Sequence, residues 1–333
     1  MIVTVVSMPE MTITRTDVSA ARARLAAESF LLVDVELPEE VPEEVPEEAP
    51  EQGAPIAGRL GLDDAEGLDW FGRAGEPPRA EFMGDRAAFV VPVVHGDRIA
   101  HIHIVVTERF LAAVHRGRAG LDRSLTTALR HERPEDTVAV LFLLLQEALA
   151  TFRRAAVQAL LETEELEDDM FEQRRPEQIY RLARLRRRSA VLHHALLPYL
   201  QAVDEILTRR MMSPSFPEER QRRAQGFQTA GRLVLADVES LQDATRRAFG
   251  SYSSLVAGEQ NGVINRLAIV SVIFLPLSFI TGFFGMNFTF LTNRLETRDE
   301  FWLLAVGLQA VVLLGSIYVL HRTRIWRRLL EED

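Results

Sequence analysis

The strongest hydrophobic pattern in this chain is a pair of long uncharged apolar runs near the C-terminus, Leu267 to Phe284 and Phe301 to Leu320. At about 1.5 Å per helical residue, the two runs reach roughly 27 and 30 Å, which is enough for each to cross the hydrocarbon core of a bilayer. The pattern therefore predicts a two-helix transmembrane hairpin with both chain termini on the same side of the membrane.

The N-terminal part of the chain has a strand-like pattern. Apolar runs or apolar–polar alternation predict strands over Phe30 to Val35, Ala87 to Val94 and Ile99 to Thr107. Short helical pieces lie between them, so residues 1–136 are expected to form an α/β domain. An acidic proline-glutamate repeat interrupts this domain between residues 36 and 55, and its prolines and like charges predict an extended surface loop.

Helical periodicity begins after this domain. Apolar residues recur at three- and four-residue spacing within residues 137–212, and Pro176 divides the segment, so a helical hairpin is expected. The acidic segment 162–169 in the first arm can pair with arginines of the second arm.

A third helix is expected to begin at Glu218, after a proline-rich turn. No proline lies between this residue and the first apolar run, so residues 213–262 are expected to contain a long stalk helix. This helix would continue into a first span over residues 263–287, despite several glycines along its length.

Charge orients the predicted hairpin. The loop 288–300 carries charges of both signs, whereas the tail 321–333 is rich in arginine immediately after the second span, residues 301–320. The positive-inside rule places this tail in the cytosol. The N-terminus lacks a signal-peptide pattern, so we expect a multi-pass protein of the cell (inner) membrane with both termini cytoplasmic.

The composition and the absence of certain motifs argue against several classes of function. A net charge of −10 and a pI near 5.4 argue against nucleic acid as a partner. The absence of cysteine excludes disulfides and thiolate metal sites. We find no nucleophile elbow, HExxH pattern or glycine-rich phosphate cradle, so neither enzymatic activity nor a resident cofactor is expected.

One tripeptide, Gly285-Met286-Asn287, follows the first apolar run directly. Together with Gln260-Asn261 and the stretch Ile273 to Gly282, it resembles in order and spacing the signature of the CorA family of divalent-cation channels. For the tripeptide alone, an ordinary helix C-cap is the competing interpretation, because glycine and asparagine both favour helix ends.

Weaker similarities to the same family extend towards the N-terminus. Phe30 to Val35 resembles the first strand, Pro78 to Glu81 the segment before a central strand, and Phe110 to His115 the strand that closes the sheet. The resemblance implies a homopentamer with an α/β domain, a funnel of long helices and a ring of first spans that line the pore.

The first span has a narrow uncharged seam that could face such a pore. Its members recur at three- and four-residue spacing, and hydrophobic constrictions are expected at its isoleucine and leucine positions. The seam contains no carboxylate, so a cation would cross it with its water shell, which suits Mg²⁺ because that ion dehydrates reluctantly. The predicted seam consists of Ile264, Leu267, Ser271, Leu275, Ser278 and Gly282.

The resemblance places a selectivity filter at the tripeptide. Five Asn287 side-chain carbonyls would accept hydrogen bonds from the waters of a hydrated cation, Gly285 would supply unusual backbone angles and Met286 would pack the turn. Outer-mouth attraction would come from three acidic residues, and a positive collar from four arginines at the inner end. These residues are Glu296, Asp299 and Glu300, and Arg322, Arg324, Arg327 and Arg328.

Two departures from the family pattern concern the ion and the gate. Leu291 to Arg294 replaces the Met-Pro-Glu-Leu of many magnesium-transporting members, and Gly226 and Gly250 stand where the family's regulatory aspartates lie. These differences shift the resemblance towards the zinc-transporting ZntB-like branch. Histidines give no independent support for zinc, because His101 and His103 are expected to be ordinary core or surface residues.

Three functional hypotheses therefore remain. The first is a homopentameric channel that moves Mg²⁺, with Co²⁺ or Ni²⁺ as related ions, into the cytosol without ATP. The second is a ZntB-like zinc transporter, with proton coupling as one mechanism. The third is a membrane-tethered cytosolic scaffold in which the hairpin serves only as an anchor in the lipid bilayer.

Overall fold

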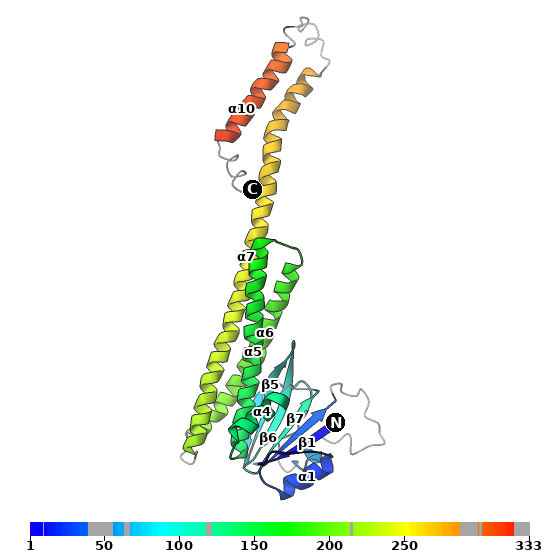
Figure 1. The fold of residues 1–333 in the computed structure, drawn as a ribbon. Helices are drawn as coiled ribbons and strands as arrows, with labels where there is room; N and C mark the ends of the chain where they lie inside the picture. The colour runs from blue at the N-terminus through cyan, green and yellow to red at the C-terminus, as the bar shows by residue number, and fades with distance from the viewer. Residues whose placement is uncertain are drawn as a thin grey trace, which may run out of the picture. The chain divides into compact units, whose positions relative to one another are not determined.

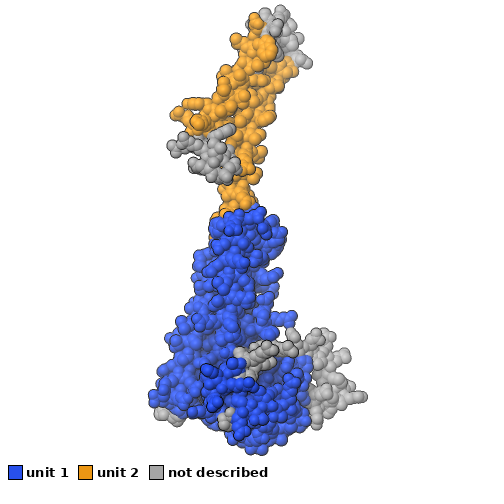
Figure 2. Space-filling view, viewed as in Figure 1, with its two compact units in different colours: residues 1–249 blue, residues 250–333 orange. Residues whose placement is uncertain are grey.

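The fold is described from a computed structural model of the protein. The structure describes residues 1–8, 10–38, 56–62, 67–117, 122–213, 216–286, 299 and 302–322. The chain divides into two compact units, residues 1–249 and residues 250–333 (Figure 2). The long helix α7 contributes residues to both units.

A mixed sheet forms the base of the first unit (Figure 1). In the described chain it has seven strands in the order β2-β1-β3-β7-β6-β5-β4, and β3–β7 is its parallel pair. The strands are β1 (Ile2–Ser7), β2 (Thr12–Thr16), β3 (Leu31–Leu37), β4 (Arg79–Met83), β5 (Arg86–His95), β6 (Arg98–Val106) and β7 (Phe110–Arg116).

This sheet confirms the predicted α/β class and corrects one strand assignment. The three predicted strands correspond to β3, β5 and β6. The expectation that Phe110 to His115 closes the sheet is wrong, because β7 lies between β3 and β6. Parallel pairing of Val33 with Ala112 inserts β7 into the interior, and the edges are β2 and β4 instead.

Helices cover both faces of the sheet. Alternate strand residues point to opposite faces, so Val105 and Val114 belong to the core beneath α1 (Val18–Ala27) and α3 (Ile56–Arg59), whereas Ile104 and Ala113 belong to the opposite face. That opposite face contacts α5, and α4 (Asp122–Glu132) packs against α5 in turn. The central strands β3, β7, β6 and β5 are consequently largely buried, whereas the edge strand β2 is exposed.

The predicted helical hairpin is confirmed. It consists of α5 (Thr137–Glu172) and α6 (Gln178–Met211), and the chain reverses in the short connection that contains Pro176. Asp136 caps α5 by accepting a hydrogen bond from the Ala139 N–H at 2.7 Å. The predicted charge pairing between the arms is also present, since Arg181 lies 3.8 Å from Asp169 and Arg188 lies 3.9 Å from Glu162.

Helix α7 runs without a break from Glu218 to Phe284, 67 residues, as the absence of proline before the apolar run predicted. Its first part packs on α6, where Phe227 and Tyr199 meet edge to face with 6.0 Å between ring centroids. A Cβ at Gly231 would lie 2.6 Å from the Leu200 side chain, so this glycine permits the two helices to approach closely.

Side-chain ion pairs hold the N-terminus of α7 in place. Arg220 donates two hydrogen bonds to the Glu108 carboxylate, at 2.7 and 2.8 Å, and one to Asp136 at 2.8 Å. The Arg220 hydrogen bonds lower the pKa of Glu108. Because Asp136 also caps α5, this cluster joins the starts of α5 and α7 to the turn before β7.

The second unit contains the end of α7, a π-helical turn over Trp302–Gly307 and α10 (Leu308–Arg322). The second apolar run was expected to form one regular helix from Phe301, but its first part is π-helical. In the described chain, α7 is the helix that is long and apolar enough to cross a membrane, and α10 is apolar but shorter.

Candidate functional site

The glycine-methionine turn marks the end of α7. The Gly285 N–H donates to the Thr281 carbonyl at 2.9 Å, and the Met286 N–H donates to the Phe283 carbonyl at 3.3 Å. The helical hydrogen-bonding pattern therefore tightens at Met286. Asn287, the third residue of the predicted filter, lies outside the described residues.

The reason for a glycine at position 285 differs from the expectation. Gly285 does not occupy the positive-φ region that was proposed for it. A Cβ at this position would instead lie 3.1 Å from the Thr281 carbonyl oxygen, closer than an ordinary van der Waals contact. Close approach of the backbone, rather than an unusual dihedral angle, thus favours glycine here.

The predicted seam lies on an open face of α7. Leu275 is 75% exposed and Leu267 is 66% exposed, and every member of the seam is exposed within the single chain. Exposure of leucine at this level is unusual for a helix of a monomeric soluble protein. The seam is thus an unburied apolar surface.

The opposite face of the same helical segment is more buried. Ile280 is 9% exposed, and Ile273 and Leu277 are half-buried. At 100° per residue, these positions lie roughly 180° away from the seam. The apolar part of α7 therefore has one face packed within its own chain and one face without a partner in that chain.

Polar groups lie between the apolar residues of the exposed seam. The Ser271 hydroxyl donates to the Leu267 carbonyl at 2.9 Å, which leaves the oxygen's lone pairs available as acceptors. Acceptors of this kind suit the hydrogen atoms of cation-bound water. The arrangement can therefore relay a hydrated ion without offering it a carboxylate.

One polar contact in this region was not predicted from the sequence. The Gln309 side-chain amide of α10 donates to the Thr281 hydroxyl of α7 at 3.0 Å, and that hydroxyl donates to the Leu277 carbonyl at 2.8 Å. A glutamine within an apolar run was the available signal, because an amide among apolar residues requires a hydrogen-bond partner. This contact joins the two helices one turn below Gly285.

The charged residues of the predicted mouths are only partly described. Asp299 and Arg322 are exposed, and Arg322 donates to the Tyr318 hydroxyl at 3.5 Å. The remaining predicted mouth residues lie outside the described part of the chain: Glu296, Glu300, Arg324, Arg327 and Arg328. The replaced segment Leu291 to Arg294 lies outside it as well.

The glycines at the positions of the family's regulatory aspartates are not required by packing. A Cβ at Gly226 or Gly250 would meet no atom within 4 Å. Packing within the described chain therefore does not require glycine at either position. Among the described residues, no group of three histidines, aspartates or glutamates is arranged to hold a metal ion.

Comparison with known proteins adds the evolutionary context. CorA of Thermotoga maritima is 26% identical over 153 residues, which are 46% of this chain and 43% of that protein. The zinc transport protein ZntB of Yersinia enterocolitica is 29% identical over 123 residues, 37% of each chain. The matched segments thus span less than half the length of these curated relatives.

The fold matches over a longer range. The structure of the CorA magnesium transporter from Methanocaldococcus jannaschii aligns with 97% of this chain and 98% of that chain, with a TM-score of 0.71 and 19% identity. The family model described as CorA-like Mg2+ transporter protein matches residues 45–322, most of the sequence. The chain therefore belongs to the CorA-like Mg2+ transporter family.

Proposed function

We propose that this protein is a homopentameric channel that moves hydrated divalent cations, Mg²⁺ foremost, into the cytosol without ATP hydrolysis. The observation that carries this proposal is the unpartnered uncharged seam of α7, opposite a face that is packed within the chain. Five seams around an axis would give each one a neighbour and enclose a pore, which a single hairpin cannot do.

The chemistry of the seam supports passage of a hydrated ion. Leu267 and Leu275 would form apolar constrictions at which water can be expelled, and Ser271 between them would accept hydrogen bonds from ion-bound water. The seam contains no carboxylate, the protein ligand through which Mg²⁺ is usually bound, so the ion would retain its tightly held waters there.

The end of α7 supports a filter at the outer mouth. Gly285 allows the close turn, and the Gln309–Thr281 hydrogen bond holds α7 against α10 one turn below it. In this proposal Asn287 presents a ring of five amide oxygens, with Glu296, Asp299 and Glu300 attracting cations from outside. Arg322 and the arginines that follow it form the inner collar.

Zinc transport is the second candidate function. It is favoured by Gly226 and Gly250, which stand where the resemblance expects the family's regulatory aspartates, and by the matched ZntB relative. Proton coupling would require a titratable relay, and the seam offers none. We therefore place passive magnesium transport first.

Competitive flux distinguishes the two ions. With the purified protein in liposomes, we expect uptake of Mg²⁺ without ATP, little affected by a pH gradient, and inhibition by Zn²⁺ only at higher concentration. The measurement uses two ion-selective dyes in the same vesicles, with protein-free liposomes as the control. Zinc uptake that rises with an inward proton gradient and resists excess Mg²⁺ would favour the ZntB-like function.

The interhelical hydrogen bond gives a separate prediction. Gln309→Leu and Thr281→Val should each lower the thermal stability of the protein in detergent, with a coupling of about 0.6 kcal/mol in a double-mutant cycle, the average for such bonds in membranes. Cation flux should also fall in these variants, because α7 loses its hydrogen bond to α10 near the proposed filter. Thr281→Ser keeps the hydroxyl and is the matched control, and additive effects of the two substitutions would contradict the assignment.

A further inference from the structure

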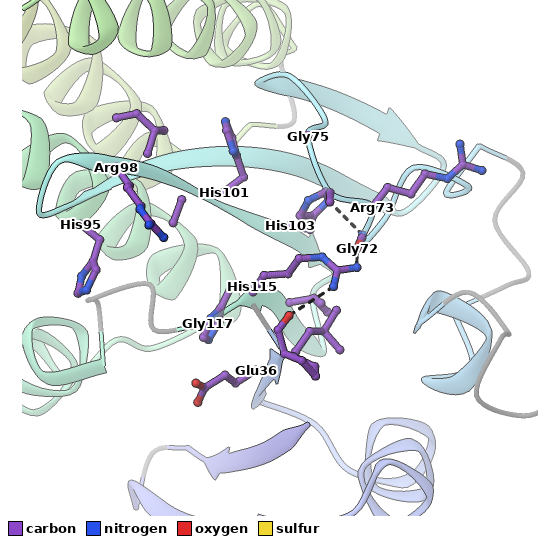
Figure 3. A pocket seen from close by; sticks show the side chains of 17 residues that line it. Glu36, Gly72, Arg73, Gly75, His95, Arg98, His101, His103, His115 and Gly117 are labelled. Carbon is purple, nitrogen blue, oxygen red and sulfur yellow. Dashed lines mark hydrogen bonds between the residues drawn. The ribbon is translucent and has the colours of Figure 1, made fainter. Parts of the chain in front are cut away.

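A basic pocket lies at one end of the sheet, within residues 1–249 (Figure 3). Its volume is about 650 Å³. It arises from the strand register, because pairing between β6 and β7 ends at Ile102 and His115, whereas Arg98 to His101 continue beside β5 alone. Among the described residues, the edge of β6 is therefore open at this step.

The lining is strongly biased towards positive and titratable nitrogen groups. Three arginines and four histidines line the pocket against one carboxylate, Glu36, in a protein with a net charge of −10. They come from sequence positions that are far apart and meet only through the strand order. The lining arginines and histidines are Arg73, Arg98 and Arg116, and His95, His101, His103 and His115.

Arg116 is held in place by groups that do not neutralise it. Its guanidinium donates to the Gly72 carbonyl at 3.2 Å and to the Pro38 carbonyl at 3.5 Å, and its Nε is buried without a hydrogen-bond partner among the described residues. No carboxylate of the described chain pairs with it. A fixed guanidinium with carbonyl partners keeps its full charge available for an anion.

The buried histidines add hydrogen-bonding groups without adding charge. Burial, then the neighbouring His101 and Arg116, lower the pKa of His103 to about 4, and burial also lowers the pKa of His101. Both rings are thus neutral at pH 7. His103 accepts a hydrogen bond from the Gly72 N–H at 3.1 Å, which fixes the loop that carries Arg73.

A resident metal does not fit this pocket. Four histidines would suggest one, but the described residues contain no group of three potential ligands arranged for a metal ion. Positive arginines in the same lining would also repel a cation. The positive charge of the pocket lining favours binding of an anion.

We propose that this pocket binds a small phosphorylated anion of nucleotide size, with Arg116 on the phosphates. Planar guanidinium groups match phosphate oxygens in a bidentate manner. The volume lies within the range of pockets for small organic ligands, and Leu37, Ile99 and Val114 provide an apolar wall for the organic part. Such a site would let a phosphate compound control the protein through residues 1–249 rather than through the proposed seam of α7.

Calorimetric titration of the full-length protein in detergent tests this proposal, with magnesium-free ATP in EDTA as the probe. We expect saturable binding of one ATP per chain, at least tenfold weaker binding of inorganic phosphate and no binding of adenosine. Arg116→Gln should weaken ATP binding at least tenfold. Arg73→Gln should weaken it about threefold, and this exposed rim position keeps the test valid if the Arg116 variant does not fold.

Arg15→Gln is the matched control, because Arg15 is exposed on the edge strand β2 of the same sheet. Its ATP affinity should equal that of the unmodified protein. The proposal is overturned if ATP does not bind, or if Arg116→Gln and Arg73→Gln both bind ATP with unchanged affinity. Preferential binding of a polyglutamate peptide over ATP would also overturn it, in favour of a protein ligand.

Discussion

Asn287→Ala is expected to reduce divalent-cation flux into liposomes to the level of protein-free vesicles, a loss well above tenfold. The substitution removes all five amide oxygens from the proposed filter at once, so a hydrated cation would lose these acceptors for its first-shell waters. A tenfold loss corresponds to about 1.4 kcal/mol of barrier, which a single lost charge-assisted hydrogen bond can supply.

Two companion variants make this result specific. Asn287→Gln keeps the amide but moves it by one methylene, so an intermediate flux is expected. Asn265→Ala removes an exposed asparagine from the same helix, away from the filter, and should leave flux within about twofold. If the Asn287→Ala protein assembles normally and conducts as the unmodified protein does, the filter and the channel proposal built on it are wrong.

The second large effect is expected from Leu275→Ser, which should raise flux on the order of tenfold. Leu275 is 75% exposed on the proposed pore face, and a ring of five leucines would expel water from the pathway. Serine is smaller and accepts hydrogen bonds, so a water column could persist at this level. Stopped-flow uptake of Mg²⁺ into proteoliposomes measures the change.

Leu277→Ser is the matched control for this variant. Leu277 carries the same side chain two residues away, on the half-buried face that lies opposite the seam. We expect its flux to stay within about twofold, with a lower thermal stability because packing is lost. Equal flux changes for the two serine variants would show that the seam does not face the pathway.

Much of the architecture could be predicted because its signals are local. The unbroken α7, the hairpin of α5 and α6 divided near Pro176, and strands β3, β5 and β6 all follow from periodicity or from a proline within a short window. The resemblance to the family, by contrast, led to the wrong position for β7 in the sheet. Its parallel pairing with β3 joins Val33 to Ala112, residues too distant in sequence for any local pattern to connect.

The candidate site likewise has some features that could be predicted from the sequence and others that could not. The Gly-Met-Asn turn and the spacing of the seam were visible in the sequence, and the structure adds the exposure of one face and the burial of the other. The steric reason for Gly285 and the partner of Gln309 were not visible, because each depends on an atom that folding brings close.

By itself, the sequence determined the elements of this protein and its family resemblance, since apolar length, helical period and a contiguous motif are properties of neighbouring residues. The tertiary structure alone decided the strand order, the contact between Thr281 and Gln309, and the basic pocket around Arg116. These features join distant segments, and their formation depends on packing and long-range hydrogen bonds rather than on local conformational preference.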